Sequence, residues 1–425
     1  MRSGHTSTVS TIAASGGRRE TGSGAESVAC PDCGLAQHLP PLAAGSLAAC
    51  RRCRCTLAVN PGYSLEAVLA LALAALMLML FSNLSPLLVL HTFNETRQNW
   101  LFSGVAELWL EGFGFLALIV AAFSIVTPLV YLGLLVAVLS GLGLGARPAL
   151  LGRAFRWTQR MRPWAMPEIY VVGSFVAYSR LKQIASVDIG LGGWAFLAAT
   201  LAFLAVDAVI DRGAVWHAIG PNADARAGEN AIACADCALL VARARDGQPC
   251  PRCGAALHHR RPQALARTAA LVLAAYLLYI PANILPVLTI ERYGRIESDT
   301  ILAGIRELAN LGLWPLAVIV FLASIAVPLL KLISLTWFLA EERRGTRRLL
   351  VARTRLHDIV NNIGRWSNID VFMGSILVAL VQFGVLTNVT AGMGGNAFAA
   401  VVLLTMIASR SFDPRLMWDA AEAKP

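Results

Sequence analysis

Long apolar segments alternate with shorter polar ones along most of the chain. Most of the apolar segments are close to the roughly 20 residues with which an α-helix crosses a hydrocarbon core. In chain order we number them spans 1 to 8, at residues 65–90, 113–140, 169–185, 191–210, 266–290, 313–340, 369–387 and 397–409. Span 8 reaches membrane length only when residues 394–396 are added. The pattern predicts an all-α integral membrane protein with eight spans.

The second half of the chain repeats the first half. At an offset of 200 residues, the motif Asn-x-x-Pro recurs in spans 1 and 5, and Gly-x-x-Glu-Leu recurs before spans 2 and 6. The residues matched at this offset are Asn83 and Asn283, Pro86 and Pro286, Gly104 and Gly304, Glu107 and Glu307, and Pro128 and Pro328. Beyond span 2 the offset becomes 202, so that Glu168 corresponds to Asp370. Because four spans per unit is an even number, both units begin and end on one side of the membrane, as parallel repeats of a tandem duplication.

Composition agrees with the apolar pattern. Hydrophobic residues make up 56% of the chain and charged residues only 15%, which is too little charge to cover a water-exposed surface. The net charge is +10, but the arginines are concentrated in a few segments between the apolar runs. This distribution is typical of membrane topology rather than of a nucleic-acid-binding face, so we expect no nucleic-acid partner.

The basic segments all lie on one side of the predicted topology. The loop between spans 2 and 3, residues 212–267 and residues 341–365 are rich in arginine, whereas the loops after spans 1, 3, 5 and 7 are acidic, balanced or uncharged. By the positive-inside rule, both termini and the segments before spans 1 and 5 are cytoplasmic. The first 25 residues lack the apolar centre of a secretory signal, so we expect a disordered cytoplasmic tail.

Eight of the nine cysteines form two quartets, one before each group of spans. Each quartet consists of two C-x2-C pairs: Cys30 and Cys33 with Cys50 and Cys53, and Cys234 and Cys237 with Cys250 and Cys253. Four thiolates on two such turns match the tetrahedral preference of zinc, and a reducing cytosol disfavours disulfides. We therefore predict two zinc ribbons with two structural ions, and free or redox-active thiols are the alternative. Cys55 has no counterpart in the second ribbon and is interpreted as a bystander.

The quartets also define the order of the domains. A closed site of four cysteines leaves no open coordination position, so it folds a small domain rather than activating water. Gly34 and Gly254 directly follow C-x2-C pairs and suit the left-handed backbone that such a turn often needs. We expect a tail at 1–25, ribbon 1 at 26–62, transmembrane unit 1 at 63–212, ribbon 2 at 228–262, transmembrane unit 2 at 263–411 and a cytoplasmic tail at 412–425.

A few ionisable residues lie inside or at the end of spans, where charge is costly and often functional. Lys331 lies in span 6 and Asp370 opens span 7 from the same side, so the two could pair and relieve both desolvation costs. Snorkelling of both side chains to the interface is the alternative. The equivalent residues of unit 1 are Tyr131 and Glu168, so the acid recurs and the lysine does not. Lys182, near the outer end of span 3, is a further candidate of the same kind.

Two repeated pairs of polar residues complete the candidates. Asn83 and Asn283 each precede a proline by three residues. A nearby amide can satisfy the backbone groups that a proline leaves unpaired, which predicts a kinked helix, with the lining of a polar cavity as the alternative. Glu107 and Glu307 fall in outer loops, where each could cap a helix start or contact an extracytoplasmic partner.

The sequence contains no recognisable catalytic motif. No G-x-x-x-x-G-K-[ST] phosphate loop, no H-E-x-x-H and no G-x-S-x-G occurs. ATP hydrolysis, metalloproteolysis and ester chemistry therefore have no visible site, and we expect a protein that is not an enzyme.

Together these motifs resemble those of the paraquat-inducible protein A family. The resemblance rests on two tandem units of a zinc ribbon with four spans, on N-x-x-P in the first span and on G-x-x-E-L before the second. It also rests on Arg365-Trp-Ser-Asn-Ile-Asp370-Val-Phe at the start of span 7, and it covers residues 26–412.

The resemblance implies a function as well as a fold. It implies a multi-pass protein of the bacterial inner membrane that works with a periplasmic MCE-domain protein, takes part in phospholipid transport between the two membranes and contributes to envelope integrity. Lys331 and Asp370 are implied as candidate members of a polar network in the bundle, which Tyr131 makes asymmetric. Two other functions remain open: a membrane thiol oxidoreductase, and an ion or small-molecule transporter that uses Lys331 and Asp370.

Overall fold

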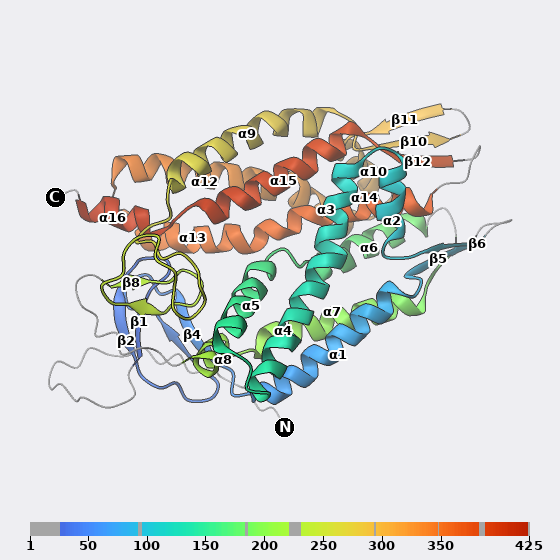
Figure 1. Cartoon of the computed structure of the whole chain (residues 1–425). Helices are drawn as coiled ribbons and strands as arrows, with labels where there is room; N and C mark the ends of the chain where they lie inside the picture. Colours follow the sequence, from blue (N-terminus) through green and yellow to red (C-terminus); the bar gives the residue numbers. More distant parts are fainter. Residues whose placement is uncertain are drawn as a thin grey trace, which may run out of the picture.

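The structure, a computed structural model, describes residues 26–91, 96–182, 186–220, 231–292, 295–346, 348–381 and 387–423. The predicted tail at 1–25 lies outside these residues, as do residues 183–185 of predicted span 3, 382–386 of predicted span 7 and 424–425. The helices form an elongated bundle, with the two cysteine-containing domains at one end and two small sheets at the other (Figure 1). We call these the ribbon end and the sheet end.

Unit 1 contains the expected helices and additional strands. Its elements, in order, are α1 (Leu65–Asn83), β5 (Leu88–His91), β6 (Thr96–Asn99), α2 (Ser103–Leu110), α3 (Gly114–Ala121), η1 (Ala122–Val126), α4 (Thr127–Gly143), α5 (Pro148–Met161), α6 (Pro167–Leu181), β7 (Ser186–Ile189), α7 (Leu191–Val209) and α8 (Arg212–Ile219). α1 runs to the sheet end, where β5 pairs with both β6 and β7 in an antiparallel sheet. The long helix α3–η1–α4 returns to the ribbon end (Figure 1).

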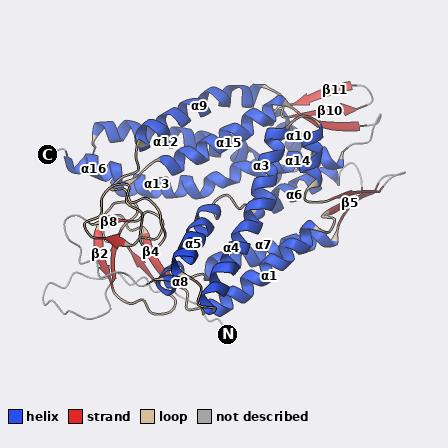
Figure 2. Cartoon of the chain, viewed as in Figure 1, coloured by secondary structure: helices blue, strands red, loops and turns tan. Residues whose placement is uncertain are grey.

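Unit 2 repeats this order. Its elements are α9 (Ala264–Ile284), β10 (Leu288–Arg292), β11 (Arg295–Asp299), α10 (Ile301–Asn310), α11 (Trp314–Phe321), η2 (Leu322–Ala326), α12 (Val327–Arg344), α13 (Leu350–Ile363), η3 (Gly364–Asn368), α14 (Ile369–Leu380), β12 (Thr387–Ala391), α15 (Met393–Ser411) and α16 (Arg415–Ala423). The sheet order β11-β10-β12 matches β6-β5-β7. The protein is mostly helical (Figure 2), and the matching order is consistent with the predicted tandem duplication.

The two sheets at the sheet end correct the all-α prediction. Predicted spans 1 and 5 extend to residues 90 and 290, but α1 ends at Asn83 and α9 ends at Ile284. The apolar residues that follow belong to strands β5 and β10. An apolar run does not by itself distinguish a helix from a strand, and here the strand continues beyond the helix end.

Asn83 and Asn283 lie in the last turns of α1 and α9. Asn83 Nδ2 donates to the carbonyl oxygen of Met79 at 2.7 Å, and Asn283 Nδ2 donates to that of Tyr279 at 2.8 Å. Each amide adds a hydrogen bond where the helix runs out of backbone partners. Pro86 and Pro286, three residues later, lie beyond the helix ends, so they do not kink these helices as predicted. A different proline, Pro281, lies inside α9.

Pro128 and Pro328 do alter the helices that contain them. A proline ring clashes with the carbonyl group four residues earlier, which here belongs to Ser124 or Ser324. One turn of π-helix, η1 or η2, spans that serine in each unit. The helix remains continuous through the turn, over 30 residues in unit 1 and 31 in unit 2. A π-turn thus replaces a sharp break.

Six helices of the described residues are long and apolar enough to cross a membrane: Leu65–Asn83, Gly114–Gly143, Leu191–Val209, Ala264–Ile284, Trp314–Arg344 and Met393–Ser411. Predicted spans 3 and 7 correspond to α6 and α14, with only 15 and 12 residues. These two shorter helices pack against each other, and the rings of Tyr170 and Phe372 lie 5.3 Å apart. All but one residue of α14 are buried, so protein rather than lipid surrounds this helix.

Short helices of each unit pack against the other unit. α2 of unit 1 packs on α14 of unit 2, where a Cβ atom on Gly104 would lie 2.6 Å from the carbonyl oxygen of Ser375. In the matching position of unit 2, the carbonyl oxygen of Gly304 in α10 accepts a hydrogen bond from Arg180 of α6 at 2.9 Å. The glycine of each G-x-x-E-L motif therefore contacts the central helix of the other unit.

Each ribbon also contacts the other unit. Ribbon 2 contains β8 (Ile232–Ala233) and β9 (Leu240–Val241), and it packs on α5 of unit 1, where Arg160 forms a bidentate ion pair with Asp236. Ribbon 1 contains β1 (Glu26–Ala29), β2 (Ala36–Leu39), β3 (Ser46–Ala49) and β4 (Thr56–Asn60). It packs on α16, where the Arg52 guanidinium lies 4.5 Å from the ring centroid of Trp418. The ribbons touch each other through β1 and β9.

The close approach of α5 to ribbon 2 predicts a sensitive position. A Cβ atom on Gly152 would lie 2.1 Å from the carbonyl oxygen of Arg252, which is backbone and cannot rotate away. We expect Gly152→Ala to lower the free energy of unfolding by about 1–3 kcal/mol. Thermal unfolding in detergent measures this loss.

Gly133→Ala is the matched control, because a Cβ atom there meets nothing within 4 Å. It lies inside a helix, where alanine is favoured over glycine by up to about 1 kcal/mol. Equal unfolding temperatures for the two variants would contradict the proposed contact.

Candidate functional site

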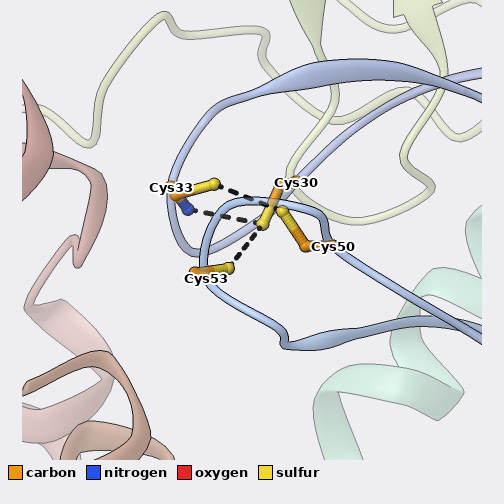
Figure 3. A group of neighbouring side chains, drawn as sticks. All are labelled: Cys30, Cys33, Cys50 and Cys53. Atoms are coloured by element: carbon orange, nitrogen blue, oxygen red, sulfur yellow. Dashed lines mark hydrogen bonds between the residues drawn. The ribbon is translucent and has the colours of Figure 1, made fainter. Parts of the chain in front are cut away.

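Both cysteine quartets are assembled. In each quartet the four sulfur atoms all lie within 4.8 Å of one another, and all eight side chains are buried. Figure 3 shows the four cysteines of ribbon 1 converging from two turns. The closest sulfur pairs are Cys30–Cys53 at 3.4 Å, Cys33–Cys50 at 3.6 Å, Cys234–Cys253 at 3.5 Å and Cys237–Cys250 at 3.6 Å.

These distances fit a metal ion better than they fit a disulfide. A disulfide joins sulfurs at about 2 Å, whereas a tetrahedral ion with metal–sulfur bonds of about 2.3 Å separates them by about 3.8 Å. The observed distances are close to the second value, and the nine cysteines, all in the described part of the chain, are free. Each quartet could therefore hold one metal ion.

The backbone of the cysteine turns explains why the sulfurs converge. The residue after the second cysteine of each pair has a left-handed conformation, with φ of 75° at Gly34 and 68° at Gly254. This confirms the role predicted for the two glycines. Arg54 and Ala238 take the same conformation after Cys53 and Cys237, at φ of 64° and 57°. All four turns have one geometry, although only two of them contain glycine.

Cys55 lies against the first quartet rather than apart from it. Its sulfur is 3.2 Å from that of Cys30, and Cys30, Cys53, Cys55 and the carboxylate of Asp32 form a second possible ligand group. Ribbon 1 thus has five sulfur atoms around its site and ribbon 2 has four.

Lys331 and Asp370 do not form the expected ion pair. Lys331 is 1% exposed, and its Nζ lies 3.4 Å from Thr405 Oγ1 of α15. Gly364 makes room for this side chain, since a Cβ atom there would lie 2.0 Å from Lys331 Cε. Asp370 is also buried, so neither side chain snorkels to the surface. Both alternatives considered from the sequence are wrong for this pair.

Asp370 faces a different place in the bundle. It lines a small cavity of about 40 Å³ together with Arg180, Thr300 and Gly304, between the two units. Its Oδ1 atom is buried without a hydrogen-bond partner among the described residues. A cavity of this size is large enough for one water molecule, which would complete the hydrogen bonding of the carboxylate.

Glu168 belongs to an ion-pair network at the ribbon end. Its Oε1 lies 3.3 Å from an Arg365 nitrogen and 3.8 Å from an Arg162 nitrogen. Arg162 also pairs with Asp207 at 3.2 Å, and Arg212 pairs with the same carboxylate at 2.9 Å. Glu168 and Asp370 therefore occupy matching sequence positions but have different partners.

The remaining candidates lie outside this network. Lys182 is exposed, with its Nζ 5.7 Å from the ring centroid of Tyr178. Glu107 and Glu307 lie inside α2 and α10 and not at helix starts, so they are not the N-terminal caps of these helices. The start of α10 is instead capped by Thr300, which accepts from the backbone N–H of Ala303.

The sequence did not predict a cavity of about 650 Å³ between the ribbons and the ribbon ends of both units. Seven arginines and five aspartates line it, so its walls are strongly charged. Burial, together with the negative charge of Asp32, raises the pKa of Asp358 to about 6. The cavity draws residues from segments far apart in the chain, which is why no local motif indicated it.

The sequence reasoning also missed a repeated glycine motif. Gly190-Leu-Gly-Gly193 and Gly392-Met-Gly-Gly395 match at the offset of 202. The backbone N–H groups of Gly192 and Gly394 donate to the carbonyl oxygens of Pro86 and Pro286 at 3.0 and 2.9 Å. Each motif lets the start of α7 or α15 approach the turn that follows α1 or α9, and the repeat was the signal that could have revealed it.

Comparison with known proteins finds relatives over most of the chain. The sequence model of the family "Paraquat-inducible protein A" matches residues 65–220 and 265–422. These two ranges cover the helices of both units. No solved structure matches the chain.

Three relatives show the range of similarity. Intermembrane transport protein PqiA of Escherichia coli (strain K12) is 32% identical, over 93% of this chain and 96% of the relative. Lipophilic envelope-spanning tunnel protein A of the same strain is 31% identical, over 93% and 91%. Probable intermembrane transport protein of Haemophilus influenzae is 27% identical, over 92% and 95%. With the six apolar helices, this similarity indicates a multi-pass membrane protein.

The quartets predict a definite metal content. Metal analysis of the purified chain should find about two ions, one for each group of four cysteines. Cys253→Ser should leave about one ion, because a site with three thiolates binds far more weakly. Cys55→Ser is the control and should keep both. An equal loss in Cys55→Ser would instead make Cys55 a ligand.

His357 predicts a pH-dependent stability. It packs between Phe338 and Phe412, with ring centroids 6.0 and 5.6 Å away, and burial with the charge of Arg261 lowers its pKa to about 4. The pKa of His357 is lower in the folded protein than the value of about 6.5 expected in the unfolded chain, so protonation favours unfolding. The free energy of unfolding therefore decreases as the pH falls below about 6.5. Between pH 7 and pH 5 the loss is on the order of 1–2 kcal/mol.

His357→Phe should remove this part of the pH dependence, because phenylalanine fits between the two rings and does not titrate. Thermal unfolding of both proteins across this pH range measures the difference, and any shared effect of the metal sites cancels. Parallel curves for the two proteins would show that His357 is not the titrating group.

Proposed function

The chain belongs to the paraquat-inducible protein A family, and on this basis we propose that it is a non-enzymatic subunit that moves lipid between the two membranes of a bacterial envelope. The observation that carries the proposal is similarity over 93% of the chain to proteins named for intermembrane transport and for an envelope-spanning tunnel. The chain would load lipid onto a partner protein, an MCE-domain protein, or receive lipid from it.

The proposed topology has eight spans in the inner membrane, with ribbons and termini in the cytoplasm. The arginine-rich segments at the ribbon end support this orientation through the positive-inside rule. α6 and α14 would complete the eight spans within a shell of longer helices, since a helix surrounded by protein need not match the bilayer by itself. The sheet end would then face the periplasm.

Zinc is the metal we propose for the quartets. Four thiolates at tetrahedral spacing match its ligand preference, and a closed site would stabilise the ribbons without taking part in transport. This role also argues against a thiol oxidoreductase, because closed metal sites engage the thiols that such an enzyme must keep reactive.

The proposed partner is an MCE-domain protein that meets the sheet end. Glu307 of α10 is exposed there, and Trp314, the first residue of the next helix α11, is exposed as well. In unit 1, Trp109 lies two residues after Glu107 in α2 and is exposed to the same extent as Trp314. Aromatic side chains beside carboxylates suit both a membrane interface and a protein contact.

The buried charges suggest how transport could be driven. Lys331 contacts Thr405, whereas Asp370 lines the small cavity between the units. Neither has a counter-charge at ion-pair distance among the described residues. Buried, unpaired ionisable groups are typical of proton relays in transporters. Ion coupling by these two residues is therefore our second proposal, and it requires no contact between them.

Deletion of the chain tests the lipid-transport role. The MCE-domain partner, purified from cells without this chain, should carry much less phospholipid than partner from wild-type cells. Lipid extraction and mass spectrometry measure the load. An unchanged load in the deletion strain would count against the proposal.

A substitution tests the role of the buried lysine. Lys331→Met keeps the length of the side chain and removes its charge, and it should reduce lipid transfer to the partner at least about tenfold. Transfer of fluorescent phospholipid from vesicles containing the chain is the measurement. Arg348→Gln, an exposed change of the same charge, is the control. Normal transfer by Lys331→Met, with metal content intact, would remove Lys331 from the mechanism.

A further inference from the structure

The large cavity at the ribbon end has an excess of positive charge in its wall. Four arginines line one part of its wall: Arg162 directly after α5, Arg212 at the start of α8, Arg365 in η3 and Arg410 in the last turn of α15. The carboxylates paired with them are those of Glu168 and Asp207. These four guanidinium groups share two carboxylates, and over the whole cavity wall seven arginines against five aspartates leave an excess of about two positive charges.

Arg410 is the member without an acidic partner. Its guanidinium lies 5.2 Å from the ring centroid of Trp164, and no carboxylate lies within ion-pair distance of it among the described residues. The charges that act on it are those of Arg365 and Arg261, which repel it. Like charges held together in a half-buried place are costly unless an anion joins them.

Structural ion pairing accounts for much of the cavity wall but not for this group. Arg160 pairs with Asp236 and Arg415 pairs with Asp413, so these arginines hold the ribbons and α16 in place. Arg261 donates to the carbonyl oxygens of Arg410 and Phe412. Arg410 therefore remains available to a ligand, together with the neighbouring arginines that share the carboxylates of Glu168 and Asp207.

We propose that this cavity binds a phosphate group, either free in solution or as part of a lipid headgroup. Several guanidinium groups around one space match the oxygen atoms of phosphate, which accept charge-assisted hydrogen bonds from each of them. The volume of about 650 Å³ exceeds what one phosphate needs and lies in the range of ligand pockets. The site concerns binding alone, so it does not rest on the transport role.

Two probes distinguish the sources of the phosphate group. The full chain, purified in an uncharged detergent with its metal ions, is titrated with inorganic phosphate by calorimetry. In parallel, native mass spectrometry measures retention of phosphatidylglycerol, with diacylglycerol as the lipid that has the same tails and no phosphate. Binding of phosphatidylglycerol alone assigns the site to a headgroup, and binding of inorganic phosphate assigns it to a soluble ligand.

Arg410→Gln should weaken binding of the phosphate probe at least about tenfold, as expected for one lost charge-assisted hydrogen bond. Arg343→Gln is the matched control, since Arg343 is exposed and does not line the cavity. Arg410→Lys, which keeps the charge, should recover most of the affinity. If Arg410→Gln fails to hold its metal ions, Arg212→Gln replaces it, because that side chain is 51% exposed and tolerates change.

Three results would overturn the proposal. One is that neither inorganic phosphate nor phosphatidylglycerol binds the wild-type chain. Another is equal binding by the Arg410→Gln and Arg343→Gln proteins when both are folded. The third is retention of diacylglycerol as strong as that of phosphatidylglycerol, which would show that the tails and not the phosphate are recognised.

Discussion

The contact between α6 and α14 is the constraint on which the rest of the bundle depends. A helix of 12 residues extends about 18 Å, well short of a hydrocarbon core of about 30 Å, so α14 needs protein around it. Longer helices of both units supply that shell. Each unit contributes one short helix to this contact, and α14 is covered by α6, α2 and α3 of the other unit.

Further contacts between the two units surround this central one. α2 of unit 1 covers α14, and α10 of unit 2 reaches Arg180 of α6. The ribbons repeat the arrangement at the other end, where ribbon 2 packs on α5 and ribbon 1 packs on α16. A metal ion that folds a ribbon would therefore also stabilise the contact between the units. The large polar cavity exists because two ribbons and two units meet there.

Duplication produced similar backbones and different chemistry. The π-turns, the helix-end asparagines and the glycine motifs occur in both units at matching positions. The buried charged residues differ between the units. Lys331 of unit 2 occupies the position of Tyr131 in unit 1, and Tyr131 packs on the ring of Phe203. Backbone features are retained because both copies need the same packing. A buried charge stays only where something uses it, since each one costs free energy.

The sequence by itself determined the duplication, the two cysteine quartets, the apolar helices and the family. Each of these depends on local spacing: C-x2-C turns place two sulfurs together, and a long apolar run has few alternatives to a membrane helix. Only the tertiary structure decided that Lys331 meets Thr405, that Asp370 faces Arg180, that Cys55 joins the first quartet and that residues after Pro86 and Pro286 form strands. These outcomes depend on which surfaces of the two units meet. Such contacts join residues far apart in the chain, and no local pattern records them.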